Sequence, residues 1–272
     1  MSEPETTDRN CMTYWLPRLA GASVPIPKTV IIDAGDDWLQ MIGFADGPKQ
    51  FPEEHAKALA LIGDVASRLA EAAPRVGTYP VFLRTGHFSG KHDWKRTCFV
   101  PSADAWRGHV AALVEMSELV GMFGECPYRF WAVREMLPTK ALAYLPAFGD
   151  FPLVSEIRAF VSGGKLVCAH PYWPAKAIRQ GFRLHDDGPI PLDVTRLIED
   201  AGRVVEASGW LKLVQRVADT FADDGAWSVD VLSTERGWYV TDVAVAASSF
   251  HWEGCERAEA MKAATGPESE GE

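Results

Sequence analysis

The chain has 272 residues, and 27 lysines and arginines stand against 37 aspartates and glutamates, which gives a formal net charge of -10. A protein whose main surface binds nucleic acid needs a positive footprint for the phosphates, so this charge excludes that class and leaves only a local basic pocket open. No apolar run approaches the roughly 20 residues that cross a bilayer, so we expect no membrane partner. A chain of this length can form one compound domain or two lobes.

The cysteine pattern indicates a reducing compartment. The five cysteines are Cys11, Cys98, Cys126, Cys168 and Cys255. They are scattered and odd in number, and none forms a Cys-x-x-Cys pair, so we expect neither a zinc site nor a disulfide framework. The polar, acidic segment from Met1 to Asn10 is not typical of a secretory signal. We therefore expect a cytoplasmic protein.

The first 78 residues predict a small α/β lobe. The apolar run Val30 to Ile32 is typical of a short buried strand. From Pro52 to about Ala73, apolar residues recur at three- and four-residue spacing, which predicts a helix. Proline at the start and two glutamates in the first turn suit a helix N-terminus.

The segment Tyr79 to Lys95 carries the densest set of polar groups. Its strand, Val81 to Arg84, leads into a loop that contains Gly86, Ser89, Gly90, Lys91, His92 and Lys95. Glycines let backbone amides approach a phosphate, and basic side chains neutralise its charge. The spacing does not match the P-loop. The alternative is an ordinary solvated loop, in which His87 and His92 are surface or structural residues rather than metal ligands.

Two further elements precede the central hairpin. The spacing of apolar residues predicts a helix from Ala103 to about Val120. The aromatic segment Tyr128 to Pro138 predicts a strand that stops at its proline. The charged pair Arg134-Glu135 near its end indicates either a transition from core to cleft or a strand end whose charges point to water.

A Gly163-Gly164 turn predicts a hairpin between 154–161 and 165–170. Strand alternation places Glu156, Arg158 and Phe160 on one face. An exposed Glu156 and Arg158 pair contributes only about 0–1 kcal/mol, whereas a pair that lines a cleft holds the guanidinium in place for an anion. Beyond the hairpin, the spacing from Pro191 to Ala222 predicts two helices.

A last hairpin carries one carboxylate on each strand. With a three-residue loop, Glu235-Arg236-Gly237, Thr234 pairs with Trp238 and Asp230 falls opposite Asp242. Carboxylates that face each other at this spacing repel, and a divalent cation reverses the interaction. The alternative is that one carboxylate lies at a solvated strand end and the two never meet.

The order of these motifs resembles the ATP-grasp fold and, more narrowly, the cell-division-cycle-123 family, from about Tyr79 to Trp252. The residues that carry the resemblance are Arg84 with Phe88 to Asp93, Arg134 to Pro138, Glu156 to Val161, and Asp230 with Asp242-Val243-Ala244. Two positions depart from the family pattern. Arg84 stands where that family usually has lysine, and Ala244 stands where it has a metal-binding asparagine.

The resemblance implies an α+β fold in which two α/β lobes hold ATP between antiparallel sheets. Residues 79–260 then form the nucleotide-binding region, and 261–272 form a disordered tail. The implied ATP contacts are Arg84, Ser89, Lys91, Arg134, Glu135, Met136, Leu137, Glu156 and Arg158. Arg158 and Lys91 are the implied catalytic residues, with Arg158 at the transferring phosphoryl group. Asp230 and Asp242 are the implied ligands of Mg²⁺.

Three functions follow from the resemblance. The first is an ATP-dependent ligase that activates a carboxylate as an acyl phosphate for capture by an amine, with a small-molecule, peptide or protein acceptor. The second is an ATP-binding assembly factor for a protein partner, as the cell-division-cycle-123 family implies. The third, suggested by Ala244, is a nucleotide-binding relic. A nucleic-acid partner is not expected.

Overall fold

A computed structural model of the chain describes residues 8–45, 48, 51–121, 128–185 and 189–263. The chain divides into two compact units. The first unit comprises Met1–Ile26, Pro138–Pro146 and Pro152–Glu272, and the second comprises Pro27–Leu137 and Ala147–Phe151. In the described part of the chain, no helix has both the length and the apolar character to cross a membrane.

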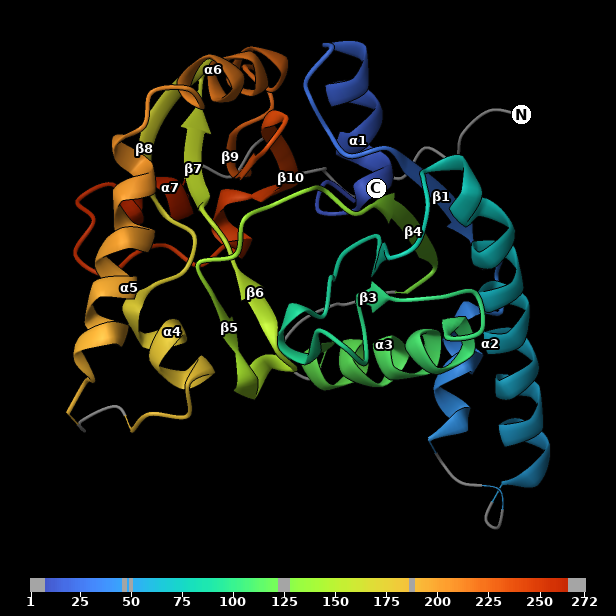
Figure 1. Cartoon of the computed structure of the whole chain (residues 1–272). Helices are drawn as coiled ribbons and strands as arrows, with labels where there is room; N and C mark the ends of the chain where they lie inside the picture. The colour runs from blue at the N-terminus through green and yellow to red at the C-terminus, as the bar shows by residue number, and fades with distance from the viewer. Residues whose placement is uncertain (1–7, 46–47, 49–50, 122–127, 186–188, 264–272) are drawn as a thin grey trace. The chain divides into compact units, whose positions relative to one another are not determined.

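The second unit contains a four-stranded antiparallel sheet with the order β1-β4-β2-β3 (Figure 1). Its strands are β1 (Thr29–Asp33), β2 (Val81–Thr85), β3 (Phe99–Val100) and β4 (Phe130–Glu135). Its helices are α2 (Pro52–Ala72) and α3 (Trp106–Gly121), with the 3-10 helices η1 (Trp38–Phe44), η2 (Ala73–Arg75) and η3 (Lys91–Asp93). The strands and both helices predicted for this region are confirmed.

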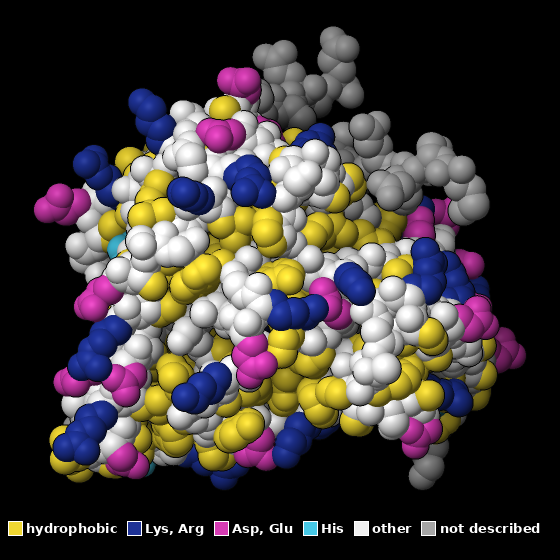
Figure 2. Space-filling model, turned by 45° about the horizontal axis from the view of Figure 1, so that its top comes forward, with side chains coloured by type: hydrophobic (Ala, Val, Ile, Leu, Met, Phe, Trp, Pro, Cys, Tyr) yellow, Lys and Arg dark blue, Asp and Glu magenta, His cyan; other side chains and the backbone are white. Residues whose placement is uncertain are grey.

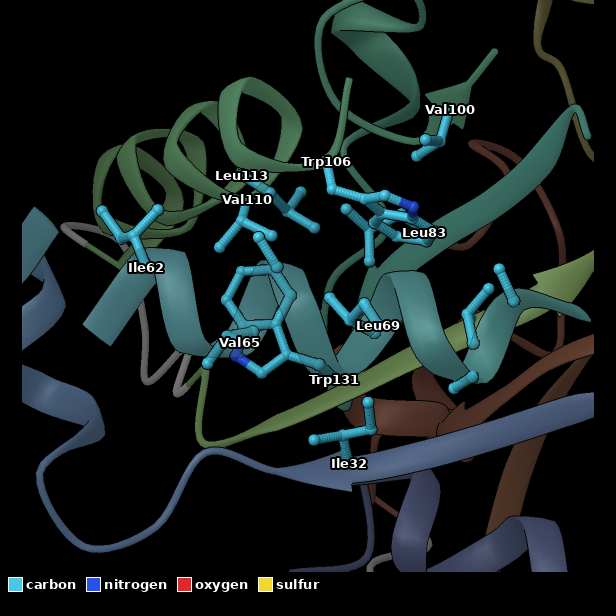
Figure 3. Packing of buried hydrophobic residues seen from close by; sticks show 14 of the residues in the cluster. Ile32, Ile62, Val65, Leu69, Leu83, Val100, Trp106, Val110, Leu113 and Trp131 are labelled. Carbon is cyan, nitrogen blue, oxygen red and sulfur yellow. The ribbon is translucent and has the colours of Figure 1, made fainter. Parts of the chain in front are cut away.

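The core of the second unit lies between the sheet and its two helices. Side chains alternate across a strand, and Leu83 of β2 and Trp131 of β4 point toward α2 and α3, where both are fully buried. Figure 3 shows this core, with Ile62, Val65, Leu69, Val110 and Leu113 among the labelled helix residues. The alternate positions of the same strands, including Arg84 and Arg134, therefore lie on the opposite face of the sheet.

The first unit contains the second four-stranded antiparallel sheet, with the order β10-β9-β7-β8. Its strands are β7 (Glu156–Ser162), β8 (Lys165–Pro171), β9 (Ala226–Thr234) and β10 (Gly237–Val245). Gly163 and Gly164 both have positive φ, +53° and +71°, as the tight turn of a two-residue hairpin requires. The mixed α and β composition and the antiparallel sheets predicted from the sequence are confirmed.

Several helices complete the first unit. They are α1 (Met12–Gly21), α4 (Ala175–Gly181), α5 (Leu192–Gly202), η5 (Arg203–Glu206), α6 (Leu211–Thr220), η6 (Ala246–Ser248) and α7 (Ala258–Ala263). The two helices expected between Pro191 and Ala222 are α5 and α6. Residues 143–153 form β5 (Ala143–Leu145), η4 (Pro146–Phe148) and β6 (Phe151–Leu153), and β5 pairs with β6.

Asp230 and Asp242 are opposite each other, as predicted, but the hairpin reaches this register by a different route. Thr234 pairs with Gly237 rather than with Trp238, so the loop has two residues instead of three. A bulge at Thr241 then adds one residue to β10 and restores the predicted pairing of the two aspartates. A bulge is an irregularity within a strand that the pattern of turn residues does not reveal.

The division of the sequence at residues 78 and 260 stays a prediction. Residues 258–263 form α7, so the first residues of the predicted tail are helical. Residues 264–272, the rest of that tail, lie outside the described part of the chain, as does Cys126.

Candidate functional site

Strand pairing brings four polar side chains into one row across the sheet of the first unit. Asp242 on β10 lies opposite Asp230 on β9, Asp230 lies opposite Arg158 on β7, and Arg158 lies opposite His170 on β8. Directly paired residues point to the same side of a sheet. All four side chains therefore leave the sheet on one side, which we call the charged face.

The other side of this sheet is apolar. Ile157 and Ala159 alternate with Arg158 along β7 and are fully buried. Helix α6 contacts all four strands and buries Leu213 and Val217, so it covers this apolar side. The amphipathic pattern of β7 thus fixes which side of the sheet carries the charges.

Arg158 and Asp230 form a bidentate ion pair at the centre of the charged face. The Arg158 Nε donates to Asp230 Oδ1 at 2.8 Å, and Nη2 donates to Oδ2 at 2.9 Å. Their side chains are 17% and 4% exposed, respectively. Burial alone lowers the pKa of the Arg158 guanidinium, but the adjacent Asp230 carboxylate raises it well above its usual value. The guanidinium also lies over the ring of Tyr172, at 4.7 Å from its centroid, so its position is fixed from two sides.

Thr241, the bulge residue, connects Glu156 with the backbone of Asp230 beside the charged row. The Thr241 hydroxyl donates to Glu156 Oε1 at 3.2 Å and approaches the backbone oxygen of Asp230 at 3.3 Å. Glu156 is buried and lies two residues before Arg158 on the same face of β7. Neither Thr241 nor Tyr172 was predicted as a site residue, because only the bulge and the strand pairing bring them to the charged face.

Asp230 and Asp242 supply carboxylate oxygens, the ligands that Mg²⁺ prefers. Asp230 accepts hydrogen bonds on both oxygens from Arg158, and an ionised carboxylate has about four lone-pair sites, so acceptor capacity remains. Asp242 Oδ1 accepts the Val243 amide at 3.1 Å. Two carboxylates on directly paired residues are a ligand set that one cation can share with phosphate oxygens and water, and the metal role of the two aspartates stays a prediction.

Ala244 occupies the next position of the charged face toward the end of β10. It pairs with Ser228, whose hydroxyl donates to the Ala244 backbone oxygen at 3.3 Å and lies 2.6 Å from the Ser249 hydroxyl. A methyl group offers no ligand atom, so this position cannot bind a second cation through its side chain. The hydroxyl pair is a polar contact that the sequence pattern did not reveal.

In the second unit, Arg84 and Arg134 share the face of the sheet opposite the core. Arg84 pairs with Ala132 and Arg134 pairs with Phe82, which makes the two arginines diagonal neighbours on adjacent strands. They are only 2% and 3% exposed. The Nε groups donate to the Thr85 backbone oxygen at 3.0 Å and to the Thr29 hydroxyl at 3.1 Å, respectively. Guanidinium groups are the side chains that bind phosphate and carboxylate through paired hydrogen bonds, so this face carries groups of the kind that recognise an anion.

The loop after β2 is held in one conformation by its neighbours. Gly90 has φ +65°, and a Cβ there would lie 2.8 Å from Leu113 Cδ1 and 3.0 Å from Thr97 Cβ, so only glycine fits. The Thr97 hydroxyl lies 2.7 Å from the Gly90 backbone oxygen. Ser89 and Lys91, predicted ATP contacts, flank Gly90 and are half-buried. The fixed backbone therefore sets where these two side chains begin.

The implied ATP contacts Glu135, Met136 and Leu137 continue from the end of β4. Glu135 and Lys28 exchange two hydrogen bonds, from the Glu135 amide to the Lys28 oxygen at 2.9 Å and from the Lys28 amide to Glu135 Oε1 at 2.9 Å. Met136 is half-buried and Leu137 is 8% exposed. The carboxylate of Glu135 thus contacts the backbone just before β1, and its role as an ATP contact stays a prediction.

The structure therefore collects the predicted residues into two sets, one on the charged face of the first unit and one in the second unit. On the face that Figure 2 shows, the lysine and arginine side chains lie singly or in small groups among acidic ones. A pocket beside β1 and α2, lined by residues that include Val30, Arg68 and Glu71, contains none of the predicted site residues.

No family model and no curated protein matches this chain. Solved structures that resemble it include a RimK domain ATP-grasp protein from Sphaerobacter thermophilus, with 16% identity, a TM-score of 0.40, and coverage of 86% of this chain and 57% of that one. Cdc123 from Schizosaccharomyces pombe gives 16% identity and a TM-score of 0.43, with 86% of this chain and 81% of that one covered.

A third structure is an N5-carboxyaminoimidazole synthase from Aspergillus clavatus in complex with ADP and 5-aminoimidazole ribonucleotide. It gives 11% identity and a TM-score of 0.44, with 94% of this chain and 50% of that one covered. ATP-grasp proteins and Cdc123, the two groups indicated by the sequence motifs, are thus both among these structures. With identities and TM-scores this low, they assign neither an activity nor a substrate to this chain.

Proposed function

We propose that the protein binds Mg-ATP through the charged face and uses it to join a carboxylate to an amine. The observation that carries this proposal is the row formed by Asp242, Asp230 and Arg158, in which two carboxylates adjoin a fixed guanidinium. Carboxylates bind the cation and the guanidinium binds phosphate, so the row has both kinds of group that a metal-bound nucleotide needs.

The residues of the charged face act by positioning and by charge neutralisation. Bound Mg-ATP supplies a phosphoryl group and a cation that neutralises it. Asp230 and Asp242 hold that cation. Arg158, kept in place by Asp230 and Tyr172, offers its remaining N–H groups to the phosphoryl oxygens as negative charge shifts onto them. A substrate carboxylate takes the phosphoryl group and ADP departs. Attack by an amine on the activated carbonyl then forms the amide and releases phosphate.

For the second unit we propose, separately, that Arg84 and Lys91 bind phosphate oxygens, that Ser89 and Arg134 bind neighbouring nucleotide oxygens, and that residues 135–137 contact a base and ribose. Support for the two arginines comes from their burial and their shared face. Support for Lys91 comes from the fixed backbone at Gly90.

A second candidate function is ATP-dependent assembly of a protein partner. Two observations favour it: Ala244 provides no ligand for a second cation, and Arg158 already engages both oxygens of Asp230. In this function the site binds ATP and consumes it slowly. The free energy of ATP binding stabilises the conformation of the chain that binds the protein partner.

Phosphate release distinguishes the two functions. The full chain is incubated with Mg-ATP and panels of carboxylates and amines, and phosphate is measured together with the amide product by mass spectrometry. Ligation predicts phosphate release that requires both substrates and is lost in Asp242→Asn but kept in Asp193→Asn, an exposed aspartate on α5. ATP binding without phosphate release across the panel supports assembly instead.

A further inference from the structure

Four potential metal ligands meet at the end of the charged face beyond Arg158. They are Cys168 and His170 on β8, and His251 and Cys255 on the segment between η6 and α7. One ligand atom from each residue lies within 4.8 Å of the others. None of these residues takes part in the proposed nucleotide chemistry. The sequence pattern did not reveal this cluster, because residues 171–250 separate Cys168 and His170 from His251 and Cys255.

The local structure explains why these side chains converge. Cys168 and His170 are two residues apart on β8, so they point to the same face of the sheet. The segment after η6 returns across that face, and the His251 Nε2 lies 3.4 Å from the Cys168 Sγ. His251 and Cys255 are four residues apart, and the Cys255 amide donates to the Trp252 oxygen at 3.3 Å, which turns Cys255 back toward the strand.

Aromatic rings hold both imidazoles in place. Phe160 stacks on His251 with centroids 3.9 Å apart and planes inclined by 20°, and Trp252 stacks on His170 at 5.9 Å and 17°. The Trp252 indole N–H donates to the Pro171 oxygen at 2.9 Å, which fixes that ring in turn. Ring orientation set by neighbouring groups is a common feature of metal-binding histidines.

The cluster contains polar atoms that its protein neighbours do not satisfy. Within the described part of the chain, His170 Nε2 and His251 Nδ1 are buried and have no hydrogen-bond partner. The ring nitrogens of the two histidines and the sulfur atoms of the two cysteines are all of the kinds that ligate metal ions, and cysteine binds a metal as the thiolate.

We propose that Cys168, His170, His251 and Cys255 bind one zinc ion as a structural site. Two sulfur and two nitrogen ligands in tetrahedral arrangement are typical of zinc. Zn–S and Zn–N bonds of about 2.3 Å and 2.0–2.1 Å place ligand atoms about 3.3–3.8 Å apart around a tetrahedron. From separations of up to 4.8 Å, the ligand atoms need to approach one another by at most about 1.0–1.5 Å to reach this geometry, which side-chain rotation can supply.

The site would fasten the C-terminal segment to the sheet beside the nucleotide-binding row. Arg158 Nη1 approaches the backbone oxygen of Phe250 at 3.5 Å, immediately before the ligand His251. Four bound ligands, with none left open, describe a structural rather than a catalytic zinc. Zinc loss is therefore expected to loosen residues 246–263 first, while the helix-covered side of the sheet stays folded.

The test is metal analysis of the full chain purified without a metal-affinity tag or chelator. We expect the zinc content, measured by elemental mass spectrometry, to be about one ion per protein chain. Replacement by Co²⁺ should give visible absorption bands of a tetrahedral site and a charge-transfer band from thiolate sulfur. Absence of zinc in protein purified from zinc-supplemented cells, together with no Co²⁺ spectrum after reduction, would overturn the proposal.

Substitution of single ligands tests which side chains hold the zinc. Cys255→Ser and His251→Gln should each lose the bound zinc, and hydrogen exchange should rise in residues 246–263. Cys98→Ser, which removes another buried cysteine, and His185→Gln, which removes an exposed histidine, should keep it. Unchanged zinc content in the first two variants would contradict the assignment. So would a Cys168–Cys255 disulfide in protein prepared under reducing conditions.

This site is independent of the proposed ATP chemistry. Zinc content is measured in protein to which no nucleotide has been added, and Asp242→Asn should leave that content unchanged. Failure of ATP binding with zinc present would therefore reject only the nucleotide proposal, and absence of zinc with intact ATP binding would reject only the metal proposal.

Discussion

At the residue scale, the ion pair between Arg158 and Asp230 is the most consequential contact of the charged face. Both side chains are largely buried, so neither charge can return to water without movement of the strand. In such a pair, the attraction offsets the cost of desolvation only while both partners are present. The pair thus serves the fold and the proposed chemistry at once.

Asp230→Asn should lower the free energy of unfolding by about 3–5 kcal/mol, because it leaves the Arg158 charge buried without its anion. Urea unfolding measures the change. Asp200→Asn breaks an exposed pair with Arg203 and should cost less than about 1 kcal/mol. Equal losses in the two variants would show that the buried pair has no special role in stability.

Ala244→Asn should strengthen the dependence of ATP binding on Mg²⁺, because it adds an amide oxygen beside Asp242 on the charged face. Ala244→Leu, a change of similar size without an oxygen, is the matched control. Titration of Mg²⁺ at fixed ATP measures the effect. The same shift in both variants would point to packing rather than to ligation.

The environment of His109 on α3 is a second residue-scale feature with a measurable consequence. Its Nδ1 lies 2.8 Å from the Thr97 backbone oxygen, and burial lowers the pKa of its imidazole. Below the unfolded pKa of about 6.5, the unfolded chain binds a proton that the folded chain does not, so stability falls with falling pH.

His109→Gln should therefore remove part of the loss of stability between neutral and mildly acidic pH. The measurement is urea unfolding of both proteins at a series of pH values, compared as the difference between them. Both proteins share all the other ionisable groups, so the difference between them reports on His109. A difference that stays constant with pH would contradict the account of His109.

At the element scale, regular periodicity was enough to predict most of the fold. Alternation or helical spacing identified β1, β2, β4 and the β7–β8 hairpin, as well as α2, α3, α5 and α6. Helix α1 was missed because Pro17 lies inside it and glycine and alanine follow. Helix α4 has only seven residues, too few for a helical period to be recognised.

The candidate site was predictable only where its residues lie on regular strands. Pairing of Asp230 with Asp242 was expected from the spacing, whereas the Thr241 bulge was not. The contacts of Tyr172 and the convergence of the two cysteines and two histidines depend on pairing between segments distant in sequence. A single sequence does not contain that information, because local propensity says nothing about which strands become neighbours.

The loop after β2 gives an element-scale prediction. Gly90→Ala should destabilise the second unit by roughly 1–3 kcal/mol, because its Cβ would clash with Leu113 and its φ is positive. Gly63→Ala, on α2 with no atom close to the added Cβ, should instead be neutral or stabilise by up to about 1 kcal/mol. Thermal unfolding compares them, and similar shifts in both would contradict a steric role for Gly90.

At the scale of the whole molecule, charge makes the cation essential to the proposed function. The chain has a net charge of -10, and the charged face places two carboxylates where phosphates are proposed to bind. ATP without a cation is repelled by both. Arg158 offsets part of this repulsion locally, and Mg²⁺ is expected to supply the rest.

Calorimetric titration of the full chain with a non-hydrolysable ATP analogue tests the central claim most directly. With Mg²⁺ present, the account predicts binding of one nucleotide per chain. Binding should weaken by at least about tenfold, or about 1.4 kcal/mol, when EDTA replaces the metal or when Asp242 is changed to Asn. No binding by the folded wild-type protein, or binding unchanged by EDTA and by Asp242→Asn, would contradict it.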